Sequence, residues 1–203
     1  MILVGLTGGI ASGKSLVANI LRDLGAYILD ADEISHELIK SGSKAWKEIV
    51  NRFGPEVLRE DKEIDRPRLA QIIFSDPEKR LELNGVLHPL IFTEEELRRK
   101  EIAEMDPAAI VVFVAPLLIE CNAHELVDKV ILVYVNKNTQ IKRLMERDGL
   151  GRKEAIMRVD SQIPLSAKRG YADYIIDGRA KKEEIEEELR RIYTELKEMS
   201  IAL

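Results

Sequence analysis

The residues with the clearest chemistry lie near the start of the chain, where a glycine-rich turn leads into lysine and serine. Gly8, four intervening residues and then Gly13, Lys14 and Ser15 match the phosphate-binding loop pattern in full. In such a loop, glycines let backbone N–H groups point at a phosphate chain, with the positive end of the next helix behind them. The lysine ammonium can reach the terminal phosphates, and the serine hydroxyl can ligate an accompanying Mg²⁺. The pattern predicts that a nucleoside triphosphate binds at Gly8, Gly9, Ile10, Ala11, Ser12, Gly13, Lys14, Ser15 and Leu16.

This motif stands in the context that it requires, between an apolar strand and a helix. Residues 2–6 suit a buried strand, and apolar residues recur at helical spacing over 16–24, before Gly25. Further apolar runs alternate with helical patterns, which predicts an α/β fold with a parallel sheet and right-handed crossovers. Ligands in such folds bind beyond the carboxyl ends of the strands. The later strands are expected at 27–29, 109–115, 129–135 and 174–176.

The helical stretches include a long segment, 65–105, with breaks in it. Pro89 follows His88 in this segment, and a proline disrupts the preceding helical turn, so a separate charged helix is expected from about Leu90. At the end of the chain, residues 181–199 predict an amphipathic helix. Its buried stripe is expected to comprise Ile185, Leu189, Ile192, Leu196 and Met199.

Two carboxylates follow strand ends, where the ligand cleft is expected. Asp32 comes shortly after the second strand and could accept the proton of an attacking hydroxyl or help to hold magnesium. It could also cap the next helix, although Asp30 is the better candidate for that cap. Glu120 follows the third long strand and either pairs with a basic residue, orients substrate or lies in a surface loop. His88 is ambiguous by spacing alone, because a lone histidine at a helix break is more often structural than catalytic.

Basic residues gather on two predicted helices after the fourth strand, over 138–148 and 152–162. Arg143 and Arg147 are four residues apart and so share one helix face. A solvated basic face is the ordinary explanation of such spacing. In an acidic protein with a phosphate loop we favour a lid, whose arginines would close over the transferring phosphoryl group and exclude water.

Composition limits the classes of partner and the cellular location that we expect. The chain has 203 residues, of which 45% are hydrophobic, and its net charge of −5 gives no indication of nucleic-acid binding. A single cysteine, Cys121, excludes an internal disulfide and fits a reducing cytoplasm. The N-terminus lacks a basic leader, and the longest apolar run, 110–119, is too short to span a bilayer. We therefore expect a cytoplasmic protein with one domain and no membrane association.

Further motifs complete an ordered set along the chain. The set comprises Gly5–Ser15, Asp30–Asp32, Asp65–Arg66 with Leu69 and Phe74, Leu87–Pro89, Pro116–Glu120, Gln140 with Arg143, Arg147–Asp148, Arg158 with Gln162, Lys168–Arg169, Ala172–Asp173 and Ile175–Asp177. The phosphate loop alone is common to many unrelated nucleotide-binding proteins, whereas the whole set at these spacings is specific. It resembles the dephospho-coenzyme A kinase family over nearly the whole chain.

The resemblance implies both an activity and a fold. The activity is transfer of the ATP γ-phosphoryl group, with Mg²⁺, to the ribose 3′-hydroxyl of dephospho-coenzyme A, the last step of coenzyme A biosynthesis. The fold is a P-loop NTPase-type five-stranded parallel sheet flanked by helices, with a helical substrate region and a helical lid. On this chain the core would cover about 1–45, 106–138 and 171–203, the substrate region about 46–105 and the lid about 139–170.

The resemblance also implies roles for particular residues. Asp32 would be the base beside the acceptor hydroxyl, and the other catalytic residues would be Lys14, Arg143 and Arg147. The acceptor would be bound by Asp32, Arg66, His88 and Glu120, and the metal by Ser15. The partners would be ATP and dephospho-coenzyme A, without nucleic acid or membrane, and the oligomeric state stays open.

At two positions the chain departs from the family pattern. The family often has glycine where Ala11 stands, and alanine is compatible with a negative φ there, so we expect little effect. The family often has asparagine after Asp177, where this chain has Gly178, so a side-chain contact to adenine at that point is not expected.

Two rival classes can be compared with this interpretation. Another small-molecule kinase, such as one acting on a nucleoside monophosphate, could share the fold, but the His88–Pro89 and Asp30–Asp32 elements argue against it. A regulatory GTP-binding switch reads guanine through an Asn-Lys-x-Asp element after a strand. Here Asn136–Asn138 is followed by Thr139, so the guanine-reading carboxylate is missing.

Overall fold

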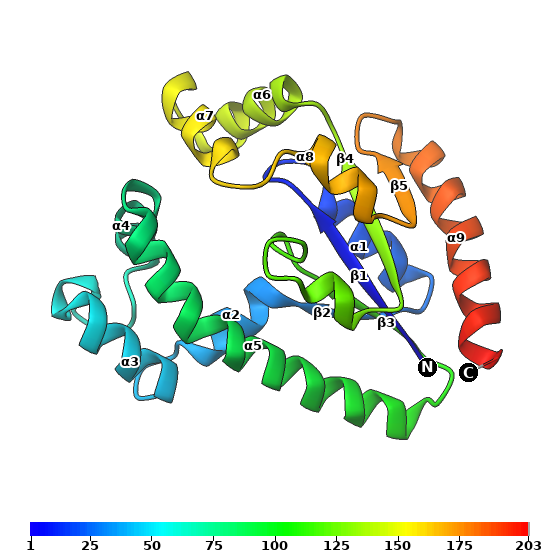
Figure 1. The fold of residues 1–203 in the computed structure, drawn as a ribbon, viewed down its shortest axis with the longest axis horizontal. Coiled ribbons are helices and arrows are strands. Elements are labelled where there is room, and N and C mark those ends of the chain that lie inside the picture. Colours follow the sequence, from blue (N-terminus) through cyan, green and yellow to red (C-terminus); the bar gives the residue numbers. More distant parts are fainter. Residues whose placement is uncertain (203) are drawn as a thin grey trace. The chain divides into compact units, whose positions relative to one another are not determined.

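The computed structural model describes residues 1–202 and divides the chain into two compact units. The first unit comprises Met1–Asp30 together with the chain from Arg99 onward, and the second comprises Ala31–Arg98. The first contains all five strands, and the second is built from helices (Figure 1). Within residues 1–202, no helix combines the length and the hydrophobicity needed to cross a membrane.

The sheet of the first unit is parallel throughout and has the order β2-β3-β1-β4-β5. Its strands are β1 (Ile2–Gly8), β2 (Tyr27–Asp30), β3 (Ile110–Val114), β4 (Lys129–Tyr134) and β5 (Tyr174–Asp177). The central strands β1 and β3 are buried along their whole length, as expected for strands covered on both faces. The expected five-stranded parallel sheet is confirmed.

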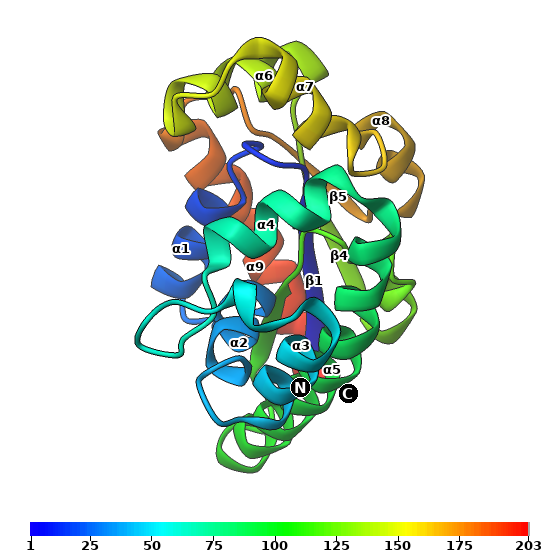
Figure 2. The ribbon, with the colours of Figure 1, turned by 90° about the vertical axis from the view of Figure 1, so that its left-hand side faces the viewer.

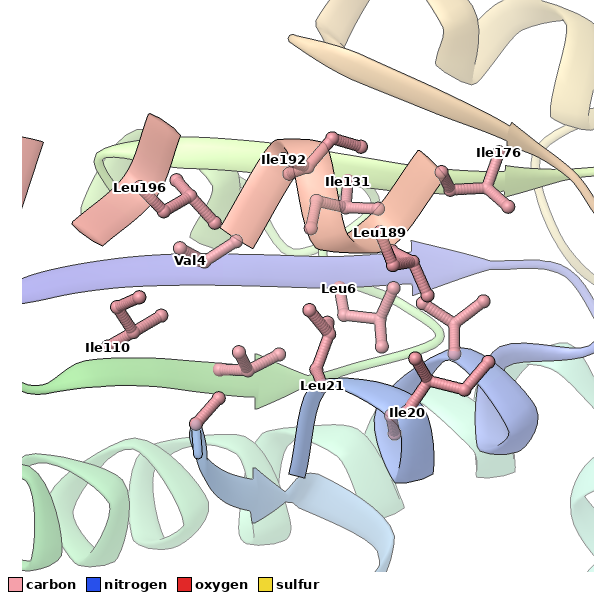
Figure 3. Packing of buried hydrophobic residues seen from close by; sticks show 14 of the residues in the cluster. Val4, Leu6, Ile20, Leu21, Ile110, Ile131, Ile176, Leu189, Ile192 and Leu196 are labelled. Atoms are coloured by element: carbon pink, nitrogen blue, oxygen red, sulfur yellow. The ribbon is translucent and has the colours of Figure 1, made fainter. Parts of the chain in front are cut away.

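One face of the sheet is covered by α1 (Lys14–Asp23) and α9 (Lys182–Ala202). Leu21 from α1 and Leu189 from α9 are fully buried against Val4 and Leu6 of β1 (Figure 3). Each such side chain contributes roughly 1.5–3 kcal/mol through burial. The expected stripe of α9 is correct except at its end, because Met199 is 36% exposed whereas Ser200 is buried and bonds to Ala108 O.

The segment after β4 forms a second layer of helices in the first unit. It contains α6 (Lys137–Asp148), α7 (Arg152–Asp160), α8 (Leu165–Lys168) and the 3₁₀ helix η3 (Arg169–Tyr171). α6 and α7 lie beyond the carboxyl ends of β1 and β4, beside the loop that follows β1 (Figures 1 and 2). They pack on each other through Ile141, Leu144, Ala155 and Val159. A short 3₁₀ helix, η2 (Ala123–Leu126), precedes β4.

The second unit has its own hydrophobic core. Its elements are α2 (Ala31–Leu38), α3 (Lys44–Phe53), η1 (Pro55–Val57), α4 (Arg66–Ser75) and most of α5 (Pro77–Met105). Ser43 caps α3 by accepting from Trp46 N, and Asp65 caps α4 by accepting from Arg68 N, as these residue types do at helix starts. Ile49 and Val57 are fully buried at the centre of this core.

The expectation that Pro89 ends a helix is wrong, because α5 runs without interruption through it. Proline removes one backbone donor and crowds the carbonyl of Gly85, four residues earlier. That local loss is offset by the stretches 78–83 and 94–105, which consist almost entirely of good helix formers. The Thr93 hydroxyl also donates to Pro89 O at 2.8 Å. Length and propensity therefore outweigh a single proline here.

Candidate active site

The glycine-rich turn forms the connection between β1 and α1, as the motif requires. β1 ends at Gly8 and α1 begins at Lys14, with Gly13 at φ +106° between them. A Cβ atom added at Gly8 would lie 2.6 Å from Ser12 Oγ and 2.8 Å from Val133 O. Only glycine fits at this position, because the loop folds back tightly over the end of β4.

Ala11 adopts φ +58°, so the expectation of a negative φ is wrong. This is the left-handed region, where an L-residue with a Cβ is destabilised by roughly 1–2 kcal/mol relative to the right-handed form. The loop thus carries backbone strain where the family often has glycine. Packing of Ala11 against the core of α6 and α7 helps to hold it in place.

Lys14 and the two nearby serines supply the polar groups of this loop. Lys14 Nζ donates to Gly8 O at 2.9 Å and Gly9 O at 3.1 Å, so its ammonium lies along the loop rather than out in solvent. Ser12 Oγ is buried and has no hydrogen-bond partner within residues 1–202. Ser15 is exposed in the first turn of α1, where its hydroxyl is open to a ligand.

The two arginines of α6 have different surroundings. Arg143 donates from Nη2 to Gly178 O at 2.8 Å and from Nη1 to Ser12 O at 3.4 Å, which brings its guanidinium to the phosphate-binding loop. Arg147 donates to Asp148 from Nε at 2.7 Å, and its side chain is 63% exposed. This hydrogen bond from Arg147 is the main reason why the pKa of Asp148 lies below its usual value.

Gly178 approaches the same loop closely. A Cβ atom at this position would lie 2.3 Å from Ser12 O, closer than two such atoms can come. The glycine therefore permits a contact between the β5–α9 connection and the loop, and this chain has no side chain there for a base contact. With this backbone conformation, no side chain fits at position 178.

Glu120 belongs to a buried ion pair that sequence patterns did not reveal. Lys168 Nζ lies 2.8 Å from Glu120 and donates to Pro116 O at 2.9 Å, and the lysine side chain is completely buried. Glu120 is 17% exposed and also accepts from Ile163 N at 3.1 Å. Of the alternatives for Glu120, pairing with a basic residue is confirmed. The sequence marked Lys168 only as part of a family motif, because burial of a lysine leaves no local pattern.

In the second unit, Asp32 and Arg66 both lie at helix starts. Asp32 is exposed in the first turn of α2. Arg66 is the first residue of α4, and its Nη2 contacts His36 Nε2. His36 was not among the expected site residues, although its spacing of four from Asp32 on one helix could have indicated it. A hollow of about 320 Å³ is lined by His36, Ile39, Lys40, Arg59, Glu63, Ile64 and Arg66.

His88 lies within α5 and is half-buried. Burial lowers the pKa of its imidazole below the usual value of 6.5, because desolvation disfavours the charged ring. The ring meets Phe92 edge to face, with centroids 6.4 Å apart. His88 is therefore a predominantly neutral imidazole at neutral pH, suited to hydrogen bonding.

The expected residues are thus divided into one group per unit, and in the second unit Asp32, Arg66 and His88 lie on three separate helices. In the first unit Lys14 and Arg143 meet at the phosphate-binding loop, whereas Arg147 and Glu120 have partners of their own. In the second unit Arg66 meets His36. The first group can bind phosphates through backbone N–H groups, an ammonium and a guanidinium.

Comparisons with known proteins agree with this arrangement. The family model of dephospho-CoA kinase matches residues 2–184. The dephospho-CoA kinase of Geobacter metallireducens is 44% identical over 195 residues, which cover 96% of each chain. That of Bacillus thuringiensis is 45% identical over 176 residues, or 87% of this chain and 88% of the relative.

Solved structures give the same result. The structure of TT1252 from Thermus thermophilus has a TM-score of 0.77 at 32% identity and covers 96% of this chain and 97% of its own. Dephospho-CoA kinase from Campylobacter jejuni has a TM-score of 0.62 at 28% identity, with 96% of each chain covered. Together with the match of the family model over most of the sequence, these similarities show that the chain belongs to the dephospho-CoA kinase family.

Proposed function

We propose that this chain transfers the γ-phosphoryl group of ATP to the ribose 3′-hydroxyl of dephospho-coenzyme A, giving coenzyme A and ADP. The observation that carries the proposal is family membership over nearly the whole chain, combined with a complete phosphate-binding loop at the end of β1. A kinase of another substrate class would share the fold but not this similarity. A GTP-binding switch is disfavoured for the same reason.

On the donor side, the loop and α6 supply the charge that phosphoryl transfer needs. The transition state spreads negative charge over the phosphoryl oxygens, so catalysis depends on positioning and preorganised positive charge. Lys14 is proposed to bind the terminal phosphates, and its present hydrogen bonds to Gly8 O and Gly9 O keep it within reach of the loop. Arg143 and Arg147 are proposed to act from the lid. The contact of Arg143 with Ser12 O supports its part in this.

The donor set also fits Mg²⁺. Ser15 offers an exposed hydroxyl beside the loop, and the buried, unpartnered hydroxyl of Ser12 marks a polar environment next to it. A hard oxygen ligand from the protein together with phosphate oxygens is the usual binding mode of this ion. When bound, the ion would neutralise charge on the β- and γ-phosphates. The role of the chain is to place Ser15 at that point.

On the acceptor side, Asp32 is proposed as the base that accepts the proton of the 3′-hydroxyl. Its exposed carboxylate in the first turn of α2 is open to a substrate, and an Asp in this role is typical of kinases. Arg66 and His88 are proposed to bind the acceptor. Glu120 is proposed there as well, and its ion pair with Lys168 would fix the direction of its carboxylate. We further propose a cytoplasmic location, which the single cysteine fits.

The proposal is tested by measuring Mg²⁺- and ATP-dependent release of ADP with dephospho-coenzyme A, AMP, uridine or no acceptor. We expect release with dephospho-coenzyme A alone. Release with another acceptor would be compatible with the fold but would rule out dephospho-coenzyme A as the substrate. Slow release that no acceptor changes would instead indicate an ATPase or a switch.

A further inference from the structure

The backbone of Ile10, in the middle of the phosphate-binding loop, is held by glutamine side chains at both its N–H and its C=O group. Gln162 Oε1 accepts from Ile10 N at 2.9 Å, and Gln140 Nε2 donates to Ile10 O at 2.9 Å. Gln140 is on α6 and is only 4% exposed, and Gln162 lies two residues beyond the end of α7. Both backbone polar groups of this loop residue are thus satisfied by the helical layer after β4.

The surroundings of Ile10 are shaped for this contact. A Cβ atom at Gly9 would lie 2.2 Å from Gln140 Nε2, so the glycine leaves the space that the amide occupies. Ile10 and Ala11 also pack against the apolar core of α6 and α7. Hydrogen bonds, steric fit and apolar packing therefore all join the tip of the loop to these helices.

Gln162 is itself anchored through the next residue. Ile163 N donates to Glu120 Oε1, and Glu120 is paired with the fully buried Lys168, whose ammonium also bonds to Pro116 O. Pro116 and Glu120 follow β3, so the anchor is tied to the sheet. Breaking a buried ion pair is strongly destabilising, because removing either charge leaves the other buried without a partner.

We propose that Gln140 and Gln162 are positioning residues that set the backbone of Ile10, and that the Glu120–Lys168 pair is the brace that holds Gln162. The inference rests on the proposed function, because it says how the same site comes to bind nucleotide. With the N–H and C=O groups of Ile10 fixed, Ala11 stays at its strained φ and the loop is preorganised for phosphate. Without them only a fraction of molecules has the competent loop, and the apparent dissociation constant rises as that fraction falls.

The two hydrogen bonds from Gln140 and Gln162 to the backbone of Ile10 form a clamp. Two matched substitutions test this clamp by changing which side chain can donate. A carboxylate can accept but cannot donate, so Gln162→Glu keeps an acceptor for Ile10 N, whereas Gln140→Glu removes the donor to Ile10 O. Both variants place the same added charge beside the backbone of the same residue, and repulsion of phosphate therefore affects them similarly. We expect the dissociation constant of ADP with Mg²⁺ to rise about 10-fold more in Gln140→Glu than in Gln162→Glu, by calorimetry. Equal values, or a larger rise in Gln162→Glu, would overturn the clamp.

Amide hydrogen exchange in the nucleotide-free protein gives a readout that needs no activity. In Gln162→Ala we expect the Ile10 amide to exchange about 10-fold faster, with the amide of Leu189 in α9 unchanged as a measure of the intact fold. The same acceleration is expected in the double variant Glu120→Gln with Lys168→Met, which removes the brace without stranding a charge. An unchanged Ile10 rate in Gln162→Ala would overturn the clamp, and in the double variant it would overturn the brace. A wild-type chain that fails to phosphorylate dephospho-coenzyme A would overturn the proposed function and leave these exchange results standing.

Discussion

In the first unit, the polar side chains around the phosphate-binding loop bond to backbone atoms. Lys14, Arg143, Gln140 and Lys168 all donate to carbonyl oxygens, and two of these side chains are buried. In the second unit, the contact between Arg66 and His36 joins two exposed side chains on different helices. The difference teaches that the polar contacts of the phosphate-binding loop are built into the fold, whereas Asp32 and Arg66, the exposed residues proposed for the acceptor, are presented on helix surfaces. Substitutions in the two units should therefore have different effects on turnover and stability.

The largest effect is expected from Asp32→Asn in the second unit. The amide cannot accept the proton of the acceptor hydroxyl, so turnover should fall roughly 10²–10⁴-fold while the affinity for ATP stays the same. Steady-state kinetics with both substrates would measure this. A variant with nearly full turnover would rule out Asp32 as the base.

Lys14→Ala tests the donor side. Removing a preorganised charge at the terminal phosphates should lower turnover about 10³-fold. Lys142→Ala is the matched control. The side chain of Lys142 is 77% exposed, and its Nζ lies 3.9 Å from Glu146 Oε1 in a weak surface ion pair. If both variants lose activity alike, the special role of Lys14 is wrong.

Ion pairs give a stability comparison between the units. Lys168→Met leaves the Glu120 carboxylate buried without its partner, and we expect the free energy of unfolding to fall by about 3–5 kcal/mol. Glu37→Gln breaks the partly exposed pair with Arg98 in the second unit and should cost less than about 1 kcal/mol. Denaturant unfolding measures both. Similar losses would contradict the contrast between built-in and surface contacts.

A smaller effect is expected from Ala11→Gly. Glycine adopts φ +58° without strain, and after the loss of chain entropy the variant should be more stable by about 0.5–1 kcal/mol. Ala18→Gly, in the buried part of α1, is the control and should be less stable. Destabilisation by Ala11→Gly would show that the loop is not strained there.

The smallest effect concerns pH. The pKa of folded His88 lies below its usual 6.5 because of burial, so the unfolded chain takes up a proton first as the pH falls. Stability contributed by neutral His88 is thus present above pH 6.5 and lost below it. The free energy of unfolding of the wild type should therefore fall more steeply below this pH than that of His88→Gln. Parallel profiles would mean that burial does not shift this group.

The elements with strong local patterns could be predicted from sequence. The apolar runs of β1 and β3 and the glycine-rich turn before Lys14 gave the sheet and the nucleotide site, because each depends on neighbours in the chain. Other features depend on residues far apart. Lys168 and Glu120 are 48 positions apart, and nothing local marks either as buried. The continuity of α5 through Pro89 follows from the helical stretches that flank it, which outweigh the tendency of proline to end a helix. The positive φ of Ala11 follows from packing, which outweighs the preference of alanine for a negative φ.

The central claim is the phosphorylation of one particular hydroxyl, and the product itself tests it most directly. Purified protein would be incubated with Mg²⁺, ATP and dephospho-coenzyme A, and the product would be identified by mass and phosphorus NMR. We predict one added phosphate, on the ribose 3′-oxygen, indistinguishable from authentic coenzyme A. A phosphate on any other oxygen, or unchanged acceptor beside consumed ATP, would contradict the account.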